Sequence, residues 1–73
     1  MNFFMNELNL NFTEEQRSQL KEYLETILDL YTEEEYEEYV EDIIYNYCLN
    51  RFGIDRKDSI KMFYVLVEEL KGT

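Results

Sequence analysis

Residues 13–36 of the chain read TEEQRSQLKEYLETILDLYTEEEY, and this stretch decides the fold. Thr13 followed by Gln16 has the pattern of a capping box, in which each side chain bonds the backbone N–H of the other residue at a helix start. Thr32 followed by Glu35 repeats the pattern 19 residues later. Two helix starts this close together predict two helices that meet at a sharp corner, with no linker between them.

The residues after each start show the periodicity of an amphipathic helix. The first helix, over residues 14–31, places its apolar residues on one face: Leu20, Leu24, Ile27, Leu28 and Tyr31. The second, over residues 33–52, has an inner apolar stripe: Tyr36, Val40, Ile43, Ile44 and Tyr47. Both patterns favour packing of one helix face against a shared core.

A third helix is expected over residues 56–71, because Gly53 can end the second helix and Asp55 can cap the next. Its expected apolar stripe is Ile60, Phe63, Tyr64, Val67 and Leu70. Residues 1–12 have no helical period, and residues 8–12 alternate apolar and polar side chains, so we expect an extended or irregular arm. The prediction is an all-α, compact three-helix domain that spans residues 1–73.

The length of 73 residues allows only a thin core, which small domains often supplement with disulfides, a metal or self-association. One cysteine, Cys48, excludes a disulfide within the chain, and the absence of histidine makes a structural zinc site improbable. Two glycines and no proline favour long helices over a turn-rich fold. Helix packing and self-association are therefore the expected sources of stability.

Catalytic chemistry has little support in the sequence. Histidine, the commonest general base, is missing, so Cys48 has no partner for nucleophilic catalysis. The Glu-x-x-His motif of di-iron bundles, a glycine-rich phosphate loop and a calcium-binding loop pattern are also missing. We therefore expect a binding protein that is not an enzyme and has no cofactor and no metal site.

The net charge is −10, and it is unevenly distributed. Residues 1–50 hold 13 acids and 2 bases (−11), whereas residues 51–73 hold 5 bases and 4 acids (+1). Phosphates would be repelled by this surface, so nucleic acid and anionic membranes are disfavoured and a basic protein is the expected partner. The lone thiol and the lack of a signal or membrane-spanning stretch favour the cytoplasm.

Seven acids and no base stand between residues 33 and 42. On a continuous helix Glu34, Glu38 and Glu41 share the outer face, where like charges repel one another. We interpret this row, with Asp42 and Tyr45, as a partner-binding surface that imitates a phosphate backbone and occupies the basic groove of a nucleic-acid-binding protein. The plainer interpretation is a solvated face that keeps a small protein in solution.

A second candidate surface consists of apolar residues that lie away from the expected inner stripes. Leu49 and Phe52, together with Tyr45, lie opposite the stripe of the second helix, and Met62 and Val65 lie away from that of the third. Helices that are apolar on all sides are normally covered on all sides. We expect Leu49, Phe52, Met62 and Val65 to mediate self-association as a homodimer, unless the N-terminal arm covers them.

These observations support three functions. The first is an acidic inhibitor or decoy of a nucleic-acid-handling protein, by analogy with small acidic helical proteins of phages and mobile elements, several of which inhibit host nucleic-acid machinery. The second is an oligomeric structural or regulatory subunit, in which the apolar residues act and the acids only solvate. The third is an immunity or antitoxin protein whose partner is a basic toxin.

Overall fold

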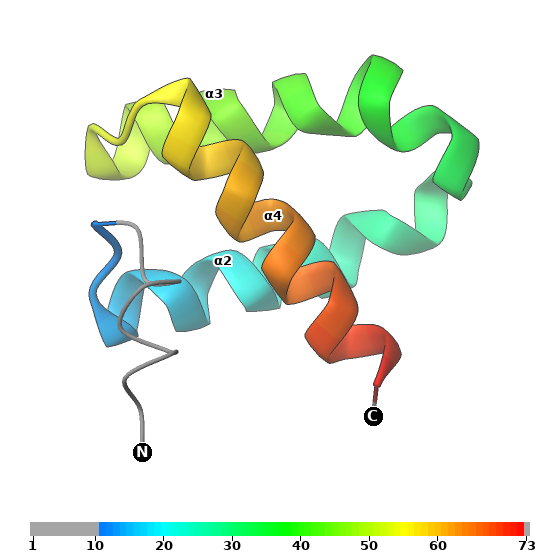
Figure 1. The fold of residues 1–73 in the computed structure, drawn as a ribbon, viewed down its shortest axis with the longest axis horizontal. Coiled ribbons are helices and arrows are strands. Elements are labelled where there is room, and N and C mark those ends of the chain that lie inside the picture. The colour runs from blue at the N-terminus through cyan, green and yellow to red at the C-terminus, as the bar shows by residue number, and fades with distance from the viewer. Residues whose placement is uncertain (1–10, 73) are drawn as a thin grey trace.

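The computed structural model describes residues 11–72. These residues form three α-helices, α2 (Glu14–Ile27), α3 (Glu41–Phe52) and α4 (Arg56–Lys71), and no strand. α2 and α3 run in opposite directions, and α4 crosses and contacts both (Figure 1). The expected all-α three-helix fold is confirmed. Most of the expected arm lies outside the described residues.

The helix termini have the capping chemistry that the sequence indicates. Thr13 Oγ1 accepts a hydrogen bond from the Gln16 backbone N–H, and the Gln16 side chain accepts one from the Thr13 N–H, both at 3.1 Å. Asp55 accepts a bond of 2.9 Å from the Asp58 N–H at the start of α4. Gly53 ends α3 with a φ of 69°, a left-handed conformation that glycine adopts without strain. These caps set the starts of α2 and α4 and the end of α3.

The corner between α2 and α3 is less regular than expected. α2 ends at Ile27 and tightens into a 3₁₀ turn, η1 (Leu28–Leu30), after which Tyr31 is extended. The next helix then begins with another 3₁₀ turn, η2 (Glu33–Glu35), and a short π-helical segment, η3 (Tyr36–Val40). Helix ends commonly tighten in this way, whereas π segments are rare and often lie at functional sites.

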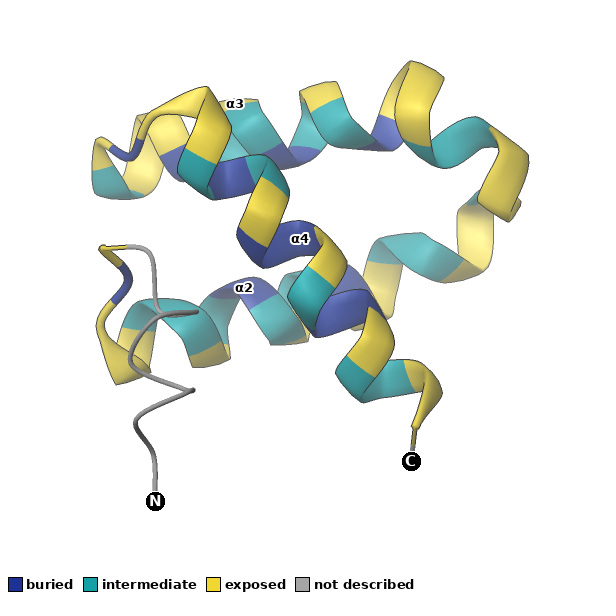
Figure 2. Ribbon diagram, in the orientation of Figure 1, coloured by how far each residue is buried: buried dark blue, intermediate teal, exposed yellow. Residues whose placement is uncertain are grey.

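The core lies where α4 crosses the other helices, as the buried residues in Figure 2 show. It consists of Phe12, Leu20, Leu24, Val40, Ile44, Cys48, Ile54, Met62, Phe63, Leu66 and Val67. In α4 the buried residues include Ser59, Met62 and Leu66, whereas Tyr64 is exposed. The expected stripe of this helix was therefore rotated by about one position, because α4 packs against two helices and not one.

Ion pairs join the ends of the helices. Glu69 of α4 pairs with Arg17 and, at 3.2 Å, with Lys21, which holds the C-terminal half of α4 to α2. At the N-terminal end of α4, Asn11 donates a hydrogen bond of 2.6 Å to Asp58. No helix within residues 11–72 has both the length and the hydrophobicity that crossing a membrane requires.

Candidate protein-binding surface

The five residues expected to bind a partner fall into two groups. Glu34 and Glu38 are exposed, and neither has a hydrogen bond or ion pair within residues 11–72. Glu41, Asp42 and Tyr45 begin α3 and surround Arg56 of α4. The structure therefore leaves the first group available for a partner and engages the second within the molecule.

Arg56 neutralises much of the second group. Its guanidinium lies 2.9 Å from Asp42, 4.0 Å from Glu41 and 5.4 Å from the centre of the Tyr45 ring. Glu41 also accepts a hydrogen bond of 2.6 Å from the hydroxyl of Tyr64. A partner that bound Glu41 or Asp42 would have to compete with these contacts.

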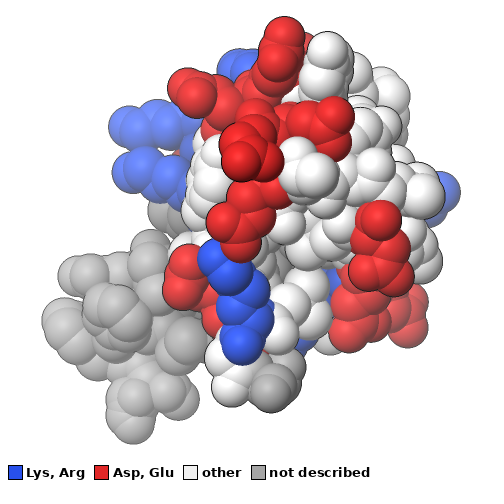
Figure 3. Space-filling view, turned by 90° about the vertical axis from the view of Figure 1, so that its right-hand side faces the viewer, with Lys and Arg blue, Asp and Glu red and all other residues white. Residues whose placement is uncertain are grey.

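An acidic hollow opens beside the first group, between the η2–η3 segment and α4. Its volume is about 360 Å³, and it is lined by Glu33, Glu34, Tyr36, Glu37, Tyr64, Val67, Glu68 and Lys71. Four carboxylates thus face two tyrosine side chains and one ammonium group. Figure 3 shows acidic side chains spread over this end of the molecule, with little Lys or Arg among them.

The ammonium group of Lys71 lies 2.9 Å from a carboxylate oxygen of Glu33. The hydrogen bond and charge of Glu33 raise the pKa of Lys71. Both side chains are more than half exposed, so this pair contributes little to stability. The contact nevertheless shows that a lysine side chain can reach a carboxylate at the edge of the hollow.

The hollow includes residues that sequence reasoning missed. Tyr36 is half-buried against the core, as its place in the inner stripe predicts, and it also lines the hollow. Tyr64 was assigned to the stripe of the third helix, whereas it is exposed and lines the hollow. Glu68 and Lys71 lie 26 or more positions after the end of the acidic run, so only the crossing of α4 over the corner brings them there. The sequence around Gly53 predicts a turn followed by a capped helix, but it does not predict the angle at which that helix crosses the others. No local signal could therefore have placed Glu68 and Lys71 at the hollow.

The apolar residues expected to mediate self-association do not form one exposed patch. Met62 is fully buried in the core, where α4 packs against α2 and α3, so contrary to the expectation it has no exposed surface for a second copy. Phe52 and Val65 are half-buried against the core, and Phe52 meets Phe12 at a ring-centre distance of 6.2 Å. Leu49 alone is clearly exposed, at 43%.

A different apolar group is exposed at the corner, close to the acidic run in sequence. Leu30 is 72% exposed, the most of any large apolar residue described, and Tyr39 is 49% exposed. The rings of Tyr39 and Tyr31 lie 6.5 Å apart. Tyrosine is a favoured residue at protein interfaces, because its ring gives contact area and its hydroxyl can hydrogen-bond.

Within residues 11–72 no group of three or more metal-ligating side chains comes together. Cys48 is buried, and burial raises the pKa of its thiol, while a hydrogen bond with Ser59 acts in the opposite direction. A thiol in this state is a packing element and not an activated nucleophile.

Comparison with protein-family models, with curated proteins and with solved structures found no match to this chain.

Proposed function

We propose that the chain binds a basic surface of another protein and blocks it, as a decoy for the nucleic acid that this surface would otherwise hold. The observation that carries the proposal is the group Glu34, Glu37 and Glu38. All three are exposed and have no hydrogen bond or ion pair within residues 11–72, and Glu34 and Glu37 line the acidic hollow.

The distribution of the bases supports this assignment. Arg17, Lys21, Arg56 and Lys71 are engaged in ion pairs, and Arg51 lies over the ring of Tyr47. The uncompensated charge of the corner is therefore a property of the folded molecule as well as of the sequence. A partner's lysines and arginines would supply the missing charge, and long-range attraction would speed the encounter.

The chemistry of the hollow fits a cationic side chain. Glu34, Glu37 and Glu68 can accept charge-assisted hydrogen bonds, and the rings of Tyr36 and Tyr64 offer surfaces to the stem of a lysine or the plane of an arginine. Lys71 already occupies one edge. A protein groove that holds phosphates presents such side chains close together, which favours a nucleic-acid-handling partner.

The test compares two double variants with the same change in charge. Glu34→Gln with Glu38→Gln removes two carboxylates at the corner, and Glu14→Gln with Glu15→Gln removes two exposed carboxylates at the start of α2. Each immobilised chain is offered the bacterial proteins that a DNA-cellulose column retains, at ~0.1 M salt. Captured proteins are identified by mass spectrometry, and their dissociation constants are measured.

The corner variant should bind the captured protein about two- to thirtyfold more weakly, since it removes two carboxylates and each exposed pair contributes about 0.2–1 kcal/mol. The α2 variant should bind within about twofold of the wild type. Equal loss in both variants would show that only net charge matters and would contradict a docking surface at the corner. An immunity or antitoxin protein would use the same surface, and capture of a basic toxin that DNA does not displace would favour that function.

An oligomeric subunit is the second candidate, favoured by the exposure of Leu30 and Leu49. Light scattering on the wild type and on Leu30→Ser and Leu49→Ser variants tests it. A dimer that becomes monomeric in either variant would support this function, whereas three monomers would contradict it.

A further inference from the structure

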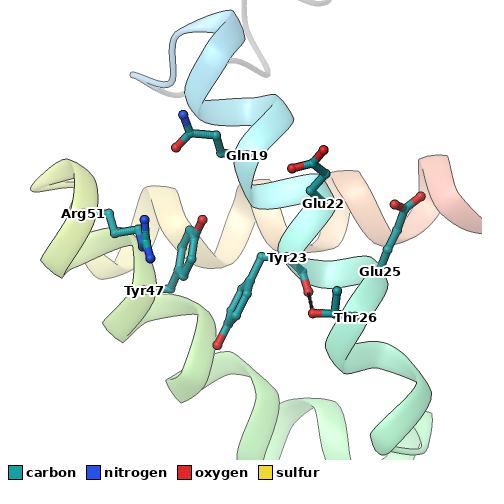
Figure 4. A pocket seen from close by; sticks show the side chains of 7 residues that line it. All are labelled: Gln19, Glu22, Tyr23, Glu25, Thr26, Tyr47 and Arg51. Carbon is teal, nitrogen blue, oxygen red and sulfur yellow. Dashed lines mark hydrogen bonds between the residues drawn. The ribbon is translucent and has the colours of Figure 1, made fainter.

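A second groove lies on the opposite side of α2 from its ion pairs with α4, between α2 and α3. Its volume is about 780 Å³, and it is lined by Gln19, Glu22, Tyr23, Glu25, Thr26, Tyr47 and Arg51 (Figure 4). A smaller hollow of about 400 Å³ shares Tyr23, Tyr47 and Arg51 with it. The side chains of Tyr23 and Tyr47 therefore separate these two neighbouring depressions.

The side chains that separate the two depressions form a stack of planar groups. The rings of Tyr23 and Tyr47 lie 4.2 Å apart with an angle of 14° between their planes. The guanidinium of Arg51 lies over the ring of Tyr47, at 5.0 Å from its centre. Both tyrosines are half-buried, so one part of each side chain packs on the core and only its outer part is exposed in the groove. Partly exposed tyrosine and arginine side chains in a depression are the residue types that dominate binding energy at protein interfaces.

The two walls of the groove carry opposite charge. Glu22 and Glu25 stand on the α2 wall, are exposed, and have no hydrogen bond or ion pair within residues 11–72. Arg51 stands on the α3 wall, and Gln19 extends from α2 toward it in Figure 4. The guanidinium of Arg51 and the amide of Gln19 both have N–H groups that can donate to a carbonyl oxygen.

We infer that this groove binds an extended peptide segment that carries arginine or lysine. The basic side chain pairs with Glu22 and Glu25, the apolar part of the segment covers Tyr23 and Tyr47, and its backbone carbonyls accept from Arg51 and Gln19. A single-stranded nucleic acid could also stack on the tyrosines, but its phosphates would meet the two carboxylates. The inference rests on the proposed function only for the positive charge of the partner. The two sites are otherwise independent, because the groove shares no lining residue with the acidic hollow.

The experiment is an NMR titration of the full ¹⁵N-labelled chain. The probe is an N-acetylated, C-amidated hexapeptide of alternating arginine and leucine. A hexapeptide with glutamate in place of arginine and a hexathymidine strand serve as comparisons. The backbone amide signals of residues 19–26 and 47–51 should shift with the arginine peptide alone.

Two double variants give the quantitative test. Glu22→Gln with Glu25→Gln should weaken peptide binding about three- to tenfold, and Glu14→Gln with Asp29→Asn, at two exposed positions that do not line the groove, should change it by less than about twofold. Neither pair of positions has a core contact, so both variants should keep the dispersed spectrum of the wild type.

The other outcomes distinguish the inference from its alternatives and from the proposed function. Signal shifts confined to the acidic hollow would show that the peptide binds there and not in the groove. They would contradict the inference and leave the proposed function intact. Shifts at the groove alone would support the inference even if the corner variants failed. Binding of hexathymidine at the groove would contradict the peptide specificity. Concentration-dependent shifts without any probe would show that a second copy of the chain fills the groove.

Discussion

The hydroxyl of Tyr64 donates a hydrogen bond of 2.6 Å to the carboxylate of Glu41 and so joins the middle of α4 to the first turn of α3. Sequence patterning placed Tyr64 in the core and Glu41 at the partner-binding surface. The contact shows that the two helices are held together at the edge of the acidic hollow by a polar interaction, next to the apolar packing of the core.

Replacing Tyr64 by Phe should lower the free energy of unfolding by about 1 kcal/mol, since it removes this hydrogen bond and keeps the ring. In a domain of this size the melting temperature should fall by about 4–8 °C. Thermal unfolding followed by circular dichroism measures the change. Tyr45→Phe is the control, because no hydrogen bond of the Tyr45 hydroxyl exists within residues 11–72. Equal shifts in both variants would contradict the role given to the Tyr64 hydroxyl.

The titration of Tyr64 should differ from that of an ordinary tyrosine. Partial burial, the hydrogen bond to Glu41 and the negative charges of Glu41 and Glu37 raise its pKa from 10.0 to about 12. Because the folded state holds this proton more tightly, its stabilising effect is complete below pH ~10 and is lost as the pH rises through ~12. Absorbance at 295 nm should show a late tyrosinate transition that Tyr64→Phe removes. A transition near pH 10 for every tyrosine would contradict the prediction.

Met62 distinguishes the observed core from the expected interface. Its side chain is fully buried, so Met62→Ala should cost about 2–5 kcal/mol and leave much of this small domain unfolded. Leu49→Ala, on the exposed side of α3, should change stability by less than about 0.5 kcal/mol. Urea denaturation measures both variants. A small effect of Met62→Ala with a large effect of Leu49→Ala would support the original interface and contradict the core described here.

The cap of α4 can be tested with two substitutions at one position. Asp55→Ala removes the acceptor of the Asp58 N–H and should destabilise the domain by about 1 kcal/mol. Asp55→Asn retains a capping oxygen and should cost only a few tenths of a kcal/mol. The difference between their melting temperatures isolates the cap from other effects of the site. No difference would mean that the helix start is held by tertiary packing alone.

The thiol of Cys48 should report on opening of the core. It is buried, and burial raises its pKa, so the reactive thiolate is scarce in the folded chain. Modification by a thiol reagent at pH 8 should be at least about a hundredfold slower than in ~8 M urea, because it requires an opened state. A native rate close to the denatured rate would show that the α3–α4 contact opens freely.

The parts of the fold that depend on local chemistry were predictable. Thr13, Gly53 and Asp55 act on backbone groups within four residues of themselves, and their roles are confirmed. The buried face of α4 was not predictable, because Ile60, Met62 and Val65 make that helix apolar on several sides. Only the packing of α4 on two helices at once decides which of these residues are covered.

The same distinction between local and long-range features applies to the candidate site. Exposure of Glu34 and Glu38 follows from the polar face of a helix and was predicted. The pairing of Asp42 with Arg56 joins residues 14 positions apart across a turn, so charge counting alone could not reveal it. The 3₁₀ and π segments between Glu33 and Val40 also change the helical register that the sequence argument assumed.

We propose above that the exposed carboxylates Glu34, Glu37 and Glu38 compete with nucleic acid for a basic groove of the partner protein. The most direct test takes a protein captured by the immobilised chain and adds double-stranded DNA at constant ionic strength, near 0.1 M, so that screening does not change. The account predicts that DNA releases the protein completely and that no complex contains all three components. A stable ternary complex, in which the protein binds DNA with unchanged affinity, would contradict the claim.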